Sequence, residues 1–304
     1  MSIKCKKMGL VFEADKFSWS EHSALQPTPI VLEDRIRVFV GSRDSLGVSR
    51  IGFVDLDKGD PRLVIGYSDG PVLDIGDDGC FDESGVVPSA VVSKDDKLYM
   101  FYAGYQLGHK VRFSVLGGLA VSDDNGLTFS RVQRTPVFER NNEETLFRVP
   151  HSVVIKDGKW CAWYGGGSQF QQGKDKTLPL YDIRYVEASS VSDFSNSGSV
   201  LLKTEGEEYR LGRPYLFSRK GKHYLFYGYS TESSPYRLGY AVSDDMRNWV
   251  RKDNLEGLEL SEDGWDSEMM AYPSVVELNN KVFMFYNGRN YGQEGFGLAE
   301  LIEC

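Results

Sequence analysis

The chain has 304 residues, 41% of them hydrophobic, and 35 lysines and arginines against 44 acidic residues give a formal net charge of -9. This length permits a large core, and the acidic balance argues against a nucleic-acid or anionic-membrane surface while leaving room for a local basic pocket. Because the N-terminal segment has no apolar signal core and no stretch approaches the roughly 18 apolar residues of a membrane span, we expect a cytoplasmic protein.

Cysteine and histidine usage gives no pattern of a metal or redox site. The four cysteines share no metal-ligand or redox spacing, and the chain has only four histidines. Cys161 lies within an apolar strand pattern, where a buried reduced thiol is expected. We therefore predict no metal, no cofactor, no nucleic-acid partner and no membrane partner. The sequence leaves the oligomeric state open.

Five hairpin patterns follow one another along the chain. Each has a short apolar run that contains a proline, a polar turn and a second, aromatic-rich run, which is typical of a β-hairpin. The prolines are Pro29, Pro88, Pro150, Pro214 and Pro273, at intervals of 59, 62, 64 and 59 residues. This regularity indicates an internal repeat of about 60 residues, longer than a hairpin needs.

Each repeat continues into further strand patterns. A third strand is expected at 118–122, 183–188, 238–242 and 296–300, and a fourth at 70–74, 135–139, 198–202 and 257–260. Four antiparallel strands repeated five times predict an all-β fold, a five-bladed β-propeller that occupies residues 1–304 as one domain. The last repeat lacks a fourth strand, and residues 9–13 match one, so we expect the N-terminal strand to close the last blade.

A turn pattern lies between the third and fourth strands. Residues 122–129, Ser-Asp-Asp-Asn-Gly-Leu-Thr-Phe, resemble the Asp box of sialidase-type propellers, and residues 243–249 are a degraded copy. Its Ser and Asp side chains accept backbone hydrogen bonds, its Gly takes a positive φ, and its aromatic residue packs beneath. We therefore expect this motif to be structural.

Function should be sought around the central depression of such a propeller. If the first strands lie nearest the axis, residues beside the prolines and after the second strands emerge there. The candidates are His22, Gln26, Arg43, Asp44, Asp82, Glu83, Arg148, His151, Arg213, Asp266, Glu268, Tyr272, Arg289 and Asn290. Arginines and carboxylates can bind the hydroxyls or anionic groups of a sugar, and aromatic rings can stack on its face. Alternatively, the acids cap turns or lie on loop surfaces, the arginines form salt bridges between blades, and the histidines are structural.

Three short motifs carry a resemblance to a known group of proteins. They are residues 81–85, Phe-Asp-Glu-Ser-Gly, residues 265–269, Trp-Asp-Ser-Glu-Met, and residues 284–288, Met-Phe-Tyr-Asn-Gly. With the repeat, they resemble the arabinanase, levansucrase and invertase superfamily, which contains glycoside hydrolase families 43 and 32. The similarity is to a branch often associated with bacterial surface-polysaccharide clusters. The resemblance implies a glycosidase of carbohydrate metabolism.

The resemblance also implies a catalytic triad, which this sequence does not reproduce. Those hydrolases place an Asp in blade one, an Asp in blade two and a Glu acid in blade three. Asp82 matches the blade-two position, but residues 24–29 contain no carboxylate, and Arg148 stands where the blade-three acid is expected.

The first functional hypothesis is action on a glycosidic bond by a carboxylate pair drawn from Asp82, Glu83, Asp266 and Glu268. One carboxyl must be protonated to donate to the leaving oxygen, and one must be ionised. We assign Glu268 as the acid, Asp82 as base or nucleophile and Asp266 as an orienting residue. The remaining candidates are assigned to binding a carbohydrate, which the arginines predict to be anionic or phosphorylated.

Two further hypotheses stay open at this point. A propeller glycosyltransferase or phosphorylase would use the arginines to hold phosphate. A non-catalytic carbohydrate-binding protein would need no triad. The sugar, its linkage and the stereochemical outcome are not specified by the sequence.

Overall fold

The computed structural model describes residues 3–303, which are almost entirely β-structure. The helical segments in this range are the 3-10 turn η1 (Ala14–Lys16) and the short α1 (Arg289–Gly292), and neither is long and apolar enough to cross a membrane. The all-β prediction is therefore confirmed.

The first sheet is antiparallel and follows the order of the chain. It has four strands, β2 (His22–Val31), β3 (Arg35–Arg43), β4 (Ser49–Asp57) and β5 (Val64–Tyr67). Residues 36–42 of β3 are all buried, because neighbouring strand groups cover both faces of this strand.

The middle of the chain forms one twelve-stranded sheet. It contains three antiparallel groups in succession: β6 (Val86–Lys94), β7 (Lys97–Leu107), β8 (Phe113–Ser122) and β9 (Ser130–Arg131); β10 (Phe147–Lys156), β11 (Lys159–Gln172), β12 (Thr177–Ala188) and β13 (Ser199–Leu202); and β14 (Glu208–Arg219), β15 (Lys222–Thr231), β16 (Arg237–Ser243) and β17 (Val250–Arg251). Short parallel contacts between β8 and β10 and between β12 and β14 join the groups.

The two ends of the chain share the remaining sheet. Its strand order is β18 (Leu255–Glu256), β1 (Ile3–Glu13), β21 (Gly295–Glu303), β20 (Lys281–Asn287) and β19 (Ala271–Leu278). β1 runs antiparallel to β21 from Lys4 to Glu13, with three register shifts. The N-terminal strand thus pairs with the strands of the last repeat.

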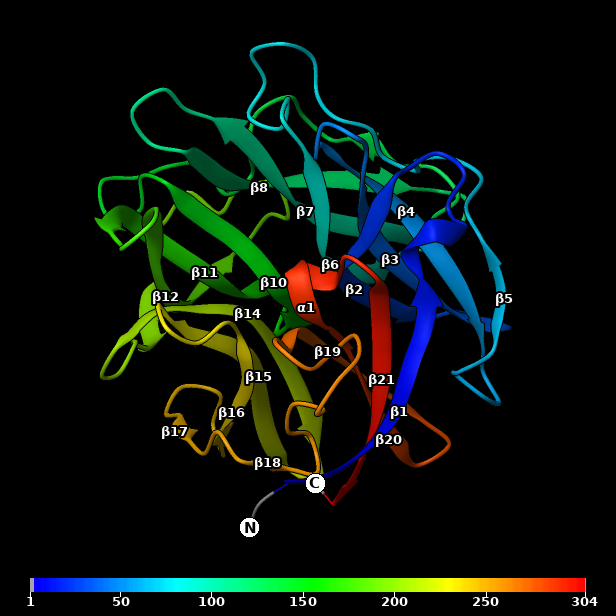
Figure 1. Ribbon diagram of the computed structural model, residues 1–304. Helices are drawn as coiled ribbons and strands as arrows, with labels where there is room; N and C mark the ends of the chain where they lie inside the picture. Colours follow the sequence, from blue (N-terminus) through cyan, green and yellow to red (C-terminus); the bar gives the residue numbers. More distant parts are fainter. Residues whose placement is uncertain (1–2, 304) are drawn as a thin grey trace.

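The first strand of each group lies near the centre of the molecule (Figure 1). β2 contacts β6, β6 contacts β10, β10 contacts β14, β14 contacts β19, and β19 contacts β2, so these five inner strands form a closed ring. The segment α1 also lies near this centre (Figure 1).

Every inner strand has a register shift near a proline. The shifts leave one or two residues without a partner on the second strand, and these include Gln26, Ser89, His151, Arg213 and Tyr272. Proline cannot donate to the strand ladder and is tolerated at such bulges. In β2 the bulge falls at Gln26 and Pro27, two residues before Pro29, which pairs with Val38.

The core lies between adjacent strand groups. One cluster joins β1 to strands from both ends of the chain through Phe12, Val54, Leu56 and Phe296. The ring of Phe12 lies 4.9 Å from that of Phe17 and 5.9 Å from that of Phe296. The burial of these side chains holds the first and last strand groups together, although their strands belong to separate sheets.

The Asp turn at residues 122–129 has the predicted local structure. Ser122 Oγ accepts a hydrogen bond from the amide of Gly126 at 2.7 Å, and Asp124 Oδ1 accepts from the amides of Leu127 and Thr128 at 3.0 Å each. Gly126 has a φ of +85° and Phe129 is buried. Asp245 accepts the equivalent bonds in the second copy.

Phe12 provides a test of the contact between the chain ends. Phe12→Ala should lower the free energy of unfolding by about 3–5 kcal/mol, because it leaves a cavity between the first and last sheets. Lys6→Ala, an exposed position on the same strand, is the control and should change stability by less than about 0.5 kcal/mol. Chemical denaturation measures both, and equal stability of the two variants would contradict the structural role of β1.

Candidate functional site

A cavity of about 280 Å³ lies where the inner strands converge. Each strand group contributes to its wall, including β2, β7, β10, β12, β14 and β19, and α1 contributes Tyr291. Gln26, His151, Arg213 and Tyr272 come from the bulges of four inner strands. Because a bulge re-aims a side chain, the repeated bulge is what turns these residues toward the axis.

The charge of the cavity wall is positive. Its cations are Arg43, Arg112, Lys176, Arg210 and Arg213. Within residues 3–303, no aspartate or glutamate lines the cavity, and none of the five cations forms an ion pair with a carboxylate. The cavity therefore concentrates positive charge in a chain whose formal net charge is -9.

Tyrosines surround Arg210 in β14. Its guanidinium carbon lies 4.0 Å from the ring centroid of Tyr236, 4.8 Å from that of Tyr209 and 5.9 Å from that of Tyr291. Burial would lower the pKa of Arg210, but the phenols of Tyr236, Tyr181 and Tyr291 raise it well above its ordinary value. Arg210 is therefore a fixed positive charge on the cavity wall.

Arg213 is the most deeply buried of the cavity cations. It donates to Gln26 Oε1 at 2.7 Å, to the Pro27 carbonyl at 2.8 Å and to Thr28 Oγ1 at 2.8 Å, while its Nε has no hydrogen-bond partner. Burial lowers its pKa to about 9. Burial and the charge of Arg213 hold the pKa of His151 well below its ordinary value, so this histidine is neutral.

The segment that carries Tyr291 has an unusual backbone. Asn290 and Tyr291 have φ values of +51° and +61°, and Gly292 follows at +82°. A left-handed conformation costs a residue with a side chain about 1–2 kcal/mol, so neighbouring contacts must hold it. Just before this segment, the buried Asn287 at the end of β20 donates to the carbonyls of Ala24 and Gly295, each at 2.8 Å.

Comparisons with known proteins place the chain in a family. It is 30% identical over 300 residues to the "Uncharacterized protein Rv1502" of Mycobacterium tuberculosis strain H37Rv, an alignment that covers 97% of this chain and 98% of the relative. The protein MT1551 of strain CDC 1551 matches equally well. The family model "Glycosyl hydrolases family 32 N-terminal domain" matches residues 67–202.

The chain belongs to the family of Rv1502, within the glycoside hydrolase-like propeller superfamily.

Solved structures of this superfamily share the fold at low identity. One glycoside hydrolase aligns with a TM-score of 0.72 and 15% identity over 98% of this chain and 92% of that one. A thermostable family-43 glycoside hydrolase gives 0.68 and 17% over 94% and 91%. The GH43_1 enzyme from Xanthomonas citri complexed with xylose gives 0.67 and 13% over 97% and 90%. The chain thus shares the fold of these proteins.

In this glycoside hydrolase-like protein, five of the predicted binding residues line the cavity. They are Gln26, Arg43, His151, Arg213 and Tyr272. The other five lie elsewhere. His22 Nδ1 is 2.7 Å from Ser23 Oγ, and Asp44 accepts hydrogen bonds from backbone amides of its own turn and forms an ion pair with Arg50. Arg289 forms an ion pair with Glu294, and the Asn290 side chain donates a hydrogen bond to Gln293.

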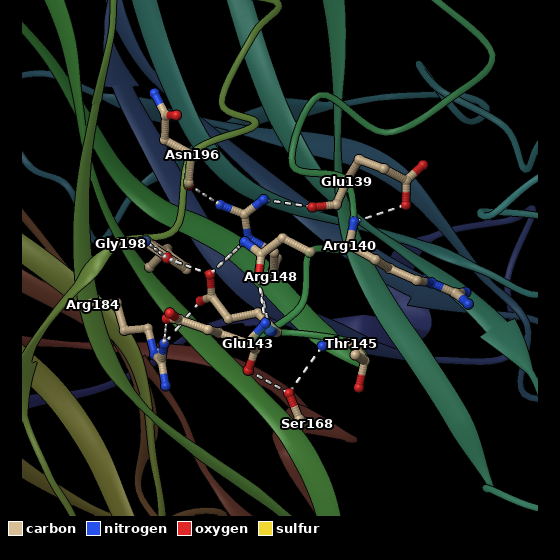
Figure 2. Close-up of polar contacts among 12 residues, drawn as sticks. Glu139, Arg140, Glu143, Thr145, Arg148, Ser168, Arg184, Asn196 and Gly198 are labelled. Carbon is tan, nitrogen blue, oxygen red and sulfur yellow. Dashed lines mark hydrogen bonds and ion pairs between the residues drawn. The ribbon is translucent and has the colours of Figure 1, made fainter.

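Arg148, the remaining predicted binding residue, is fully buried behind the cavity wall. Figure 2 shows its guanidinium between Glu139 and Asn196, whose backbone carbonyls accept its hydrogen bonds. Its Nε lies 3.1 Å from Glu144 Oε2. Arg148 thus forms a buried ion pair, as in the structural alternative, but the pair joins residues four positions apart and not two blades.

Asp82 and Asp266 occupy equivalent buried positions in two repeats. Asp82 Oδ2 accepts from Tyr102 at 3.0 Å and pairs with Arg131 at 2.8 Å, and Asp266 Oδ2 accepts from Tyr286 at 3.0 Å and pairs with Lys7 at 2.9 Å. Glu144 forms the same arrangement with Tyr164 and Arg148. In all three cases the carboxylate precedes the tyrosine by 20 residues.

The other two predicted catalytic carboxylates also lie off the cavity wall. Glu83 accepts from the amide of Gly79 and from Gln106, and the side chain of Glu268 is exposed. The structure therefore does not bring Asp82, Glu83, Asp266 and Glu268 together in the cavity. Their catalytic assignment stays a prediction. In the described part of the chain, no group of three His, Cys, Asp or Glu side chains is placed to hold a metal ion.

Sequence reasoning missed several cavity residues. Arg210 stands three residues before Arg213 in the same strand, and Tyr291 directly follows the predicted Asn290. Arg112 and Lys176 come from the turns that connect the second and third strands of their groups. A search that included these turns, and not only positions beside the prolines, would have found them.

The buried carboxylates give a testable difference between a structural and a catalytic role. Asp82→Ala should lower the free energy of unfolding by at least about 1–3 kcal/mol, because it leaves Tyr102 and Arg131 without their acceptor. Asp60→Ala removes an exposed carboxylate that pairs with Arg62 and should have an effect below about 0.5 kcal/mol. Thermal and urea unfolding give both values, and unchanged stability in Asp82→Ala would argue against the structural role.

Proposed function

We propose that this protein binds an anionic or phosphorylated carbohydrate in the central cavity and acts on its glycosidic bond. The observation that carries the proposal is the set of five cations on a wall without a carboxylate, in a glycoside hydrolase-like fold. We further propose that residues 1–304 form one propeller of five blades, each with four principal strands and the last completed by β1.

The electrostatics support an anion over a neutral glycan. Arg43, Arg112 and Lys176 surround the cavity from three different turns or strand ends, and Arg210 and Arg213 lie deeper. A guanidinium binds phosphate or carboxylate through paired charge-assisted hydrogen bonds, and unpaired cations that converge on one space repel each other until an anion enters. The tyrosines supply apolar faces on which a sugar ring can stack.

The same wall favours a second candidate over simple acid-base hydrolysis. A glycosidase needs a protonated carboxyl beside the leaving oxygen, whereas a glycosyl phosphate or nucleotide sugar has a leaving group that departs as an anion. The cations suit such a group. A phosphorylase or glycosyltransferase is therefore the alternative, and a binding protein without turnover is the outcome expected if no sugar phosphate reacts.

Ligand charge can be tested by calorimetry. Inorganic phosphate and sugar phosphates should bind more tightly than the matching neutral sugars, and raising the salt concentration should weaken their binding. Arg43→Gln and Lys176→Gln should each weaken phosphate binding by about tenfold, since a hydrogen bond to a charged group contributes roughly 1.5 kcal/mol.

Arg62→Gln is the matched control for these variants, because Arg62 is an exposed arginine that pairs with Asp60 and does not line the cavity. It should leave phosphate affinity unchanged. Equal affinity for neutral and phosphorylated sugars at every salt concentration would refute the proposal.

A further inference from the structure

Tyr291 places a phenol oxygen next to the cations of the cavity. Its hydroxyl oxygen lies 3.3 Å from Arg210 Nη2, which donates to it, and its ring forms part of the cavity wall. Burial would raise the pKa of Tyr291, but the charge and hydrogen bond of Arg210, together with Lys176 and Arg112, lower it below its ordinary value. The nearby cations favour the phenolate form.

The neighbouring phenols have the opposite character. Burial raises the pKa of Tyr105 to about 12, and it raises those of Tyr209, Tyr236 and Tyr272. The hydroxyls of Tyr236 and Tyr181 form a hydrogen bond, with their oxygens 2.5 Å apart. The groups that face Tyr291 are therefore cations and neutral phenols, without a carboxylate among the described lining residues.

The backbone holds Tyr291 in place. The ring stacks with Tyr272 at a centroid distance of 6.3 Å and meets Tyr236 edge-on at 6.4 Å. Residues 290–292 are all left-handed, and position 292 requires glycine because a Cβ there would approach Asn287 Nδ2 to 2.2 Å. Strained backbone of this kind concentrates where a side chain must be aimed.

We propose that Tyr291 is a catalytic residue, the nucleophile that attacks the anomeric carbon of a sugar phosphate ester bound in this cavity. The inference rests on the proposed function and names its reacting group. Tyrosine takes this role in place of a carboxylate in some glycosidases, so the chemistry is available to a phenol.

The first step exchanges one carbon–oxygen bond for another. The phenolate oxygen of Tyr291 bonds to the anomeric carbon while the bond from that carbon to the phosphate oxygen breaks. The electron pair leaves with the monoprotonated phosphate as hydrogen phosphate, beside the cavity cations. No general acid is required, because the leaving oxygen is already stabilised as an anion.

The second step restores the enzyme. A water oxygen bonds to the anomeric carbon, the bond to Tyr291 breaks with its electron pair returning to the phenolate, and the water proton passes to solvent. The sum of both steps converts a sugar phosphate and water into free sugar and phosphate. An acceptor hydroxyl in place of water would give glycosyl transfer.

Selective acetylation of the whole protein tests the nucleophile directly. N-acetylimidazole acetylates phenolate oxygens, and peptide mass spectrometry can follow Tyr291 against Tyr67, an exposed phenol outside the cavity. At neutral pH, Tyr291 should be acetylated faster than Tyr67, because the adjacent cations favour its phenolate form. The pH at which Tyr291 reaches half of its maximal rate should lie below 10.0, the ordinary pKa of a tyrosine phenol.

Variants of the neighbouring cations serve as the comparison. Arg210→Gln should move the half-maximal rate of Tyr291 to higher pH, and Lys176→Gln, an exposed substitution that does not threaten folding, should move it in the same direction by less. Arg62→Gln should not move it. Acetylation of Tyr291 no faster than that of Tyr67 would overturn the inference.

A binding and turnover comparison separates this inference from the proposed function. For sugar phosphates that bind, Tyr291→Phe should lower kcat at least about 100-fold with Kd nearly unchanged, because the ring stays and only the nucleophile is removed. Unchanged turnover in this variant, or tight binding by the wild type without any turnover, would refute the role of Tyr291 and leave the binding proposal intact. Failure of the wild type to bind phosphate or any sugar phosphate would refute the proposed function itself.

Discussion

The bulge in each inner strand is the constraint on which the rest of the site depends. An uninterrupted strand would alternate its side chains between the two neighbouring sheets and would send none toward the axis. Each inner strand has one register shift at a proline, and the residues left without a partner there include Gln26, Ser89, His151, Arg213 and Tyr272. Four of these five line the cavity. The bulge, repeated around the ring, thus allows the inner strands to approach one another closely and supplies four residues of the cavity wall.

A second repeated contact joins segments within a strand group. Tyr102, Tyr164 and Tyr286 stand at the same place in three second strands, and each donates to a carboxylate that also pairs with a cation. Burial and the adjacent carboxylate raise the pKa of each of these phenols, so they stay donors at any ordinary pH. Asp82, Glu144 and Asp266 are held in these contacts and do not line the cavity, whose wall carries cations and phenols. The separation of the two sets of charges gives an acidic protein a basic pocket.

The residues that line the cavity differ from the catalytic triad that the family resemblance implies. Arg148 stands where an acid was expected and is buried in an ion pair with Glu144, while five cations and several phenols, among them Arg210 and Tyr291, face the cavity. A cation beside a phenol favours chemistry in which negative charge is held and moved, and it is poorly suited to donating a proton to a leaving oxygen. The fold and the reaction chemistry of this protein are therefore separate questions, as they are for other widely used folds.

The sequence by itself determined the features that depend on short spacings. Strand alternation, the repeat of about 60 residues and the hydrogen bonds of the turn at Ser122 to Phe129 are local properties, so they could be predicted from neighbouring residues. Only the tertiary structure decided which polar residues meet. Arg213 directly precedes Pro214 and lines the cavity, whereas Arg148 stands two residues before Pro150 and does not, because the bulge frees Arg213 from its partner strand while Arg148 stays paired with Gly166. The place of Tyr291 depends on a left-handed turn that begins three residues after Asn287, and the side chain of Asn287 is bound to Ala24, 263 residues away in the chain.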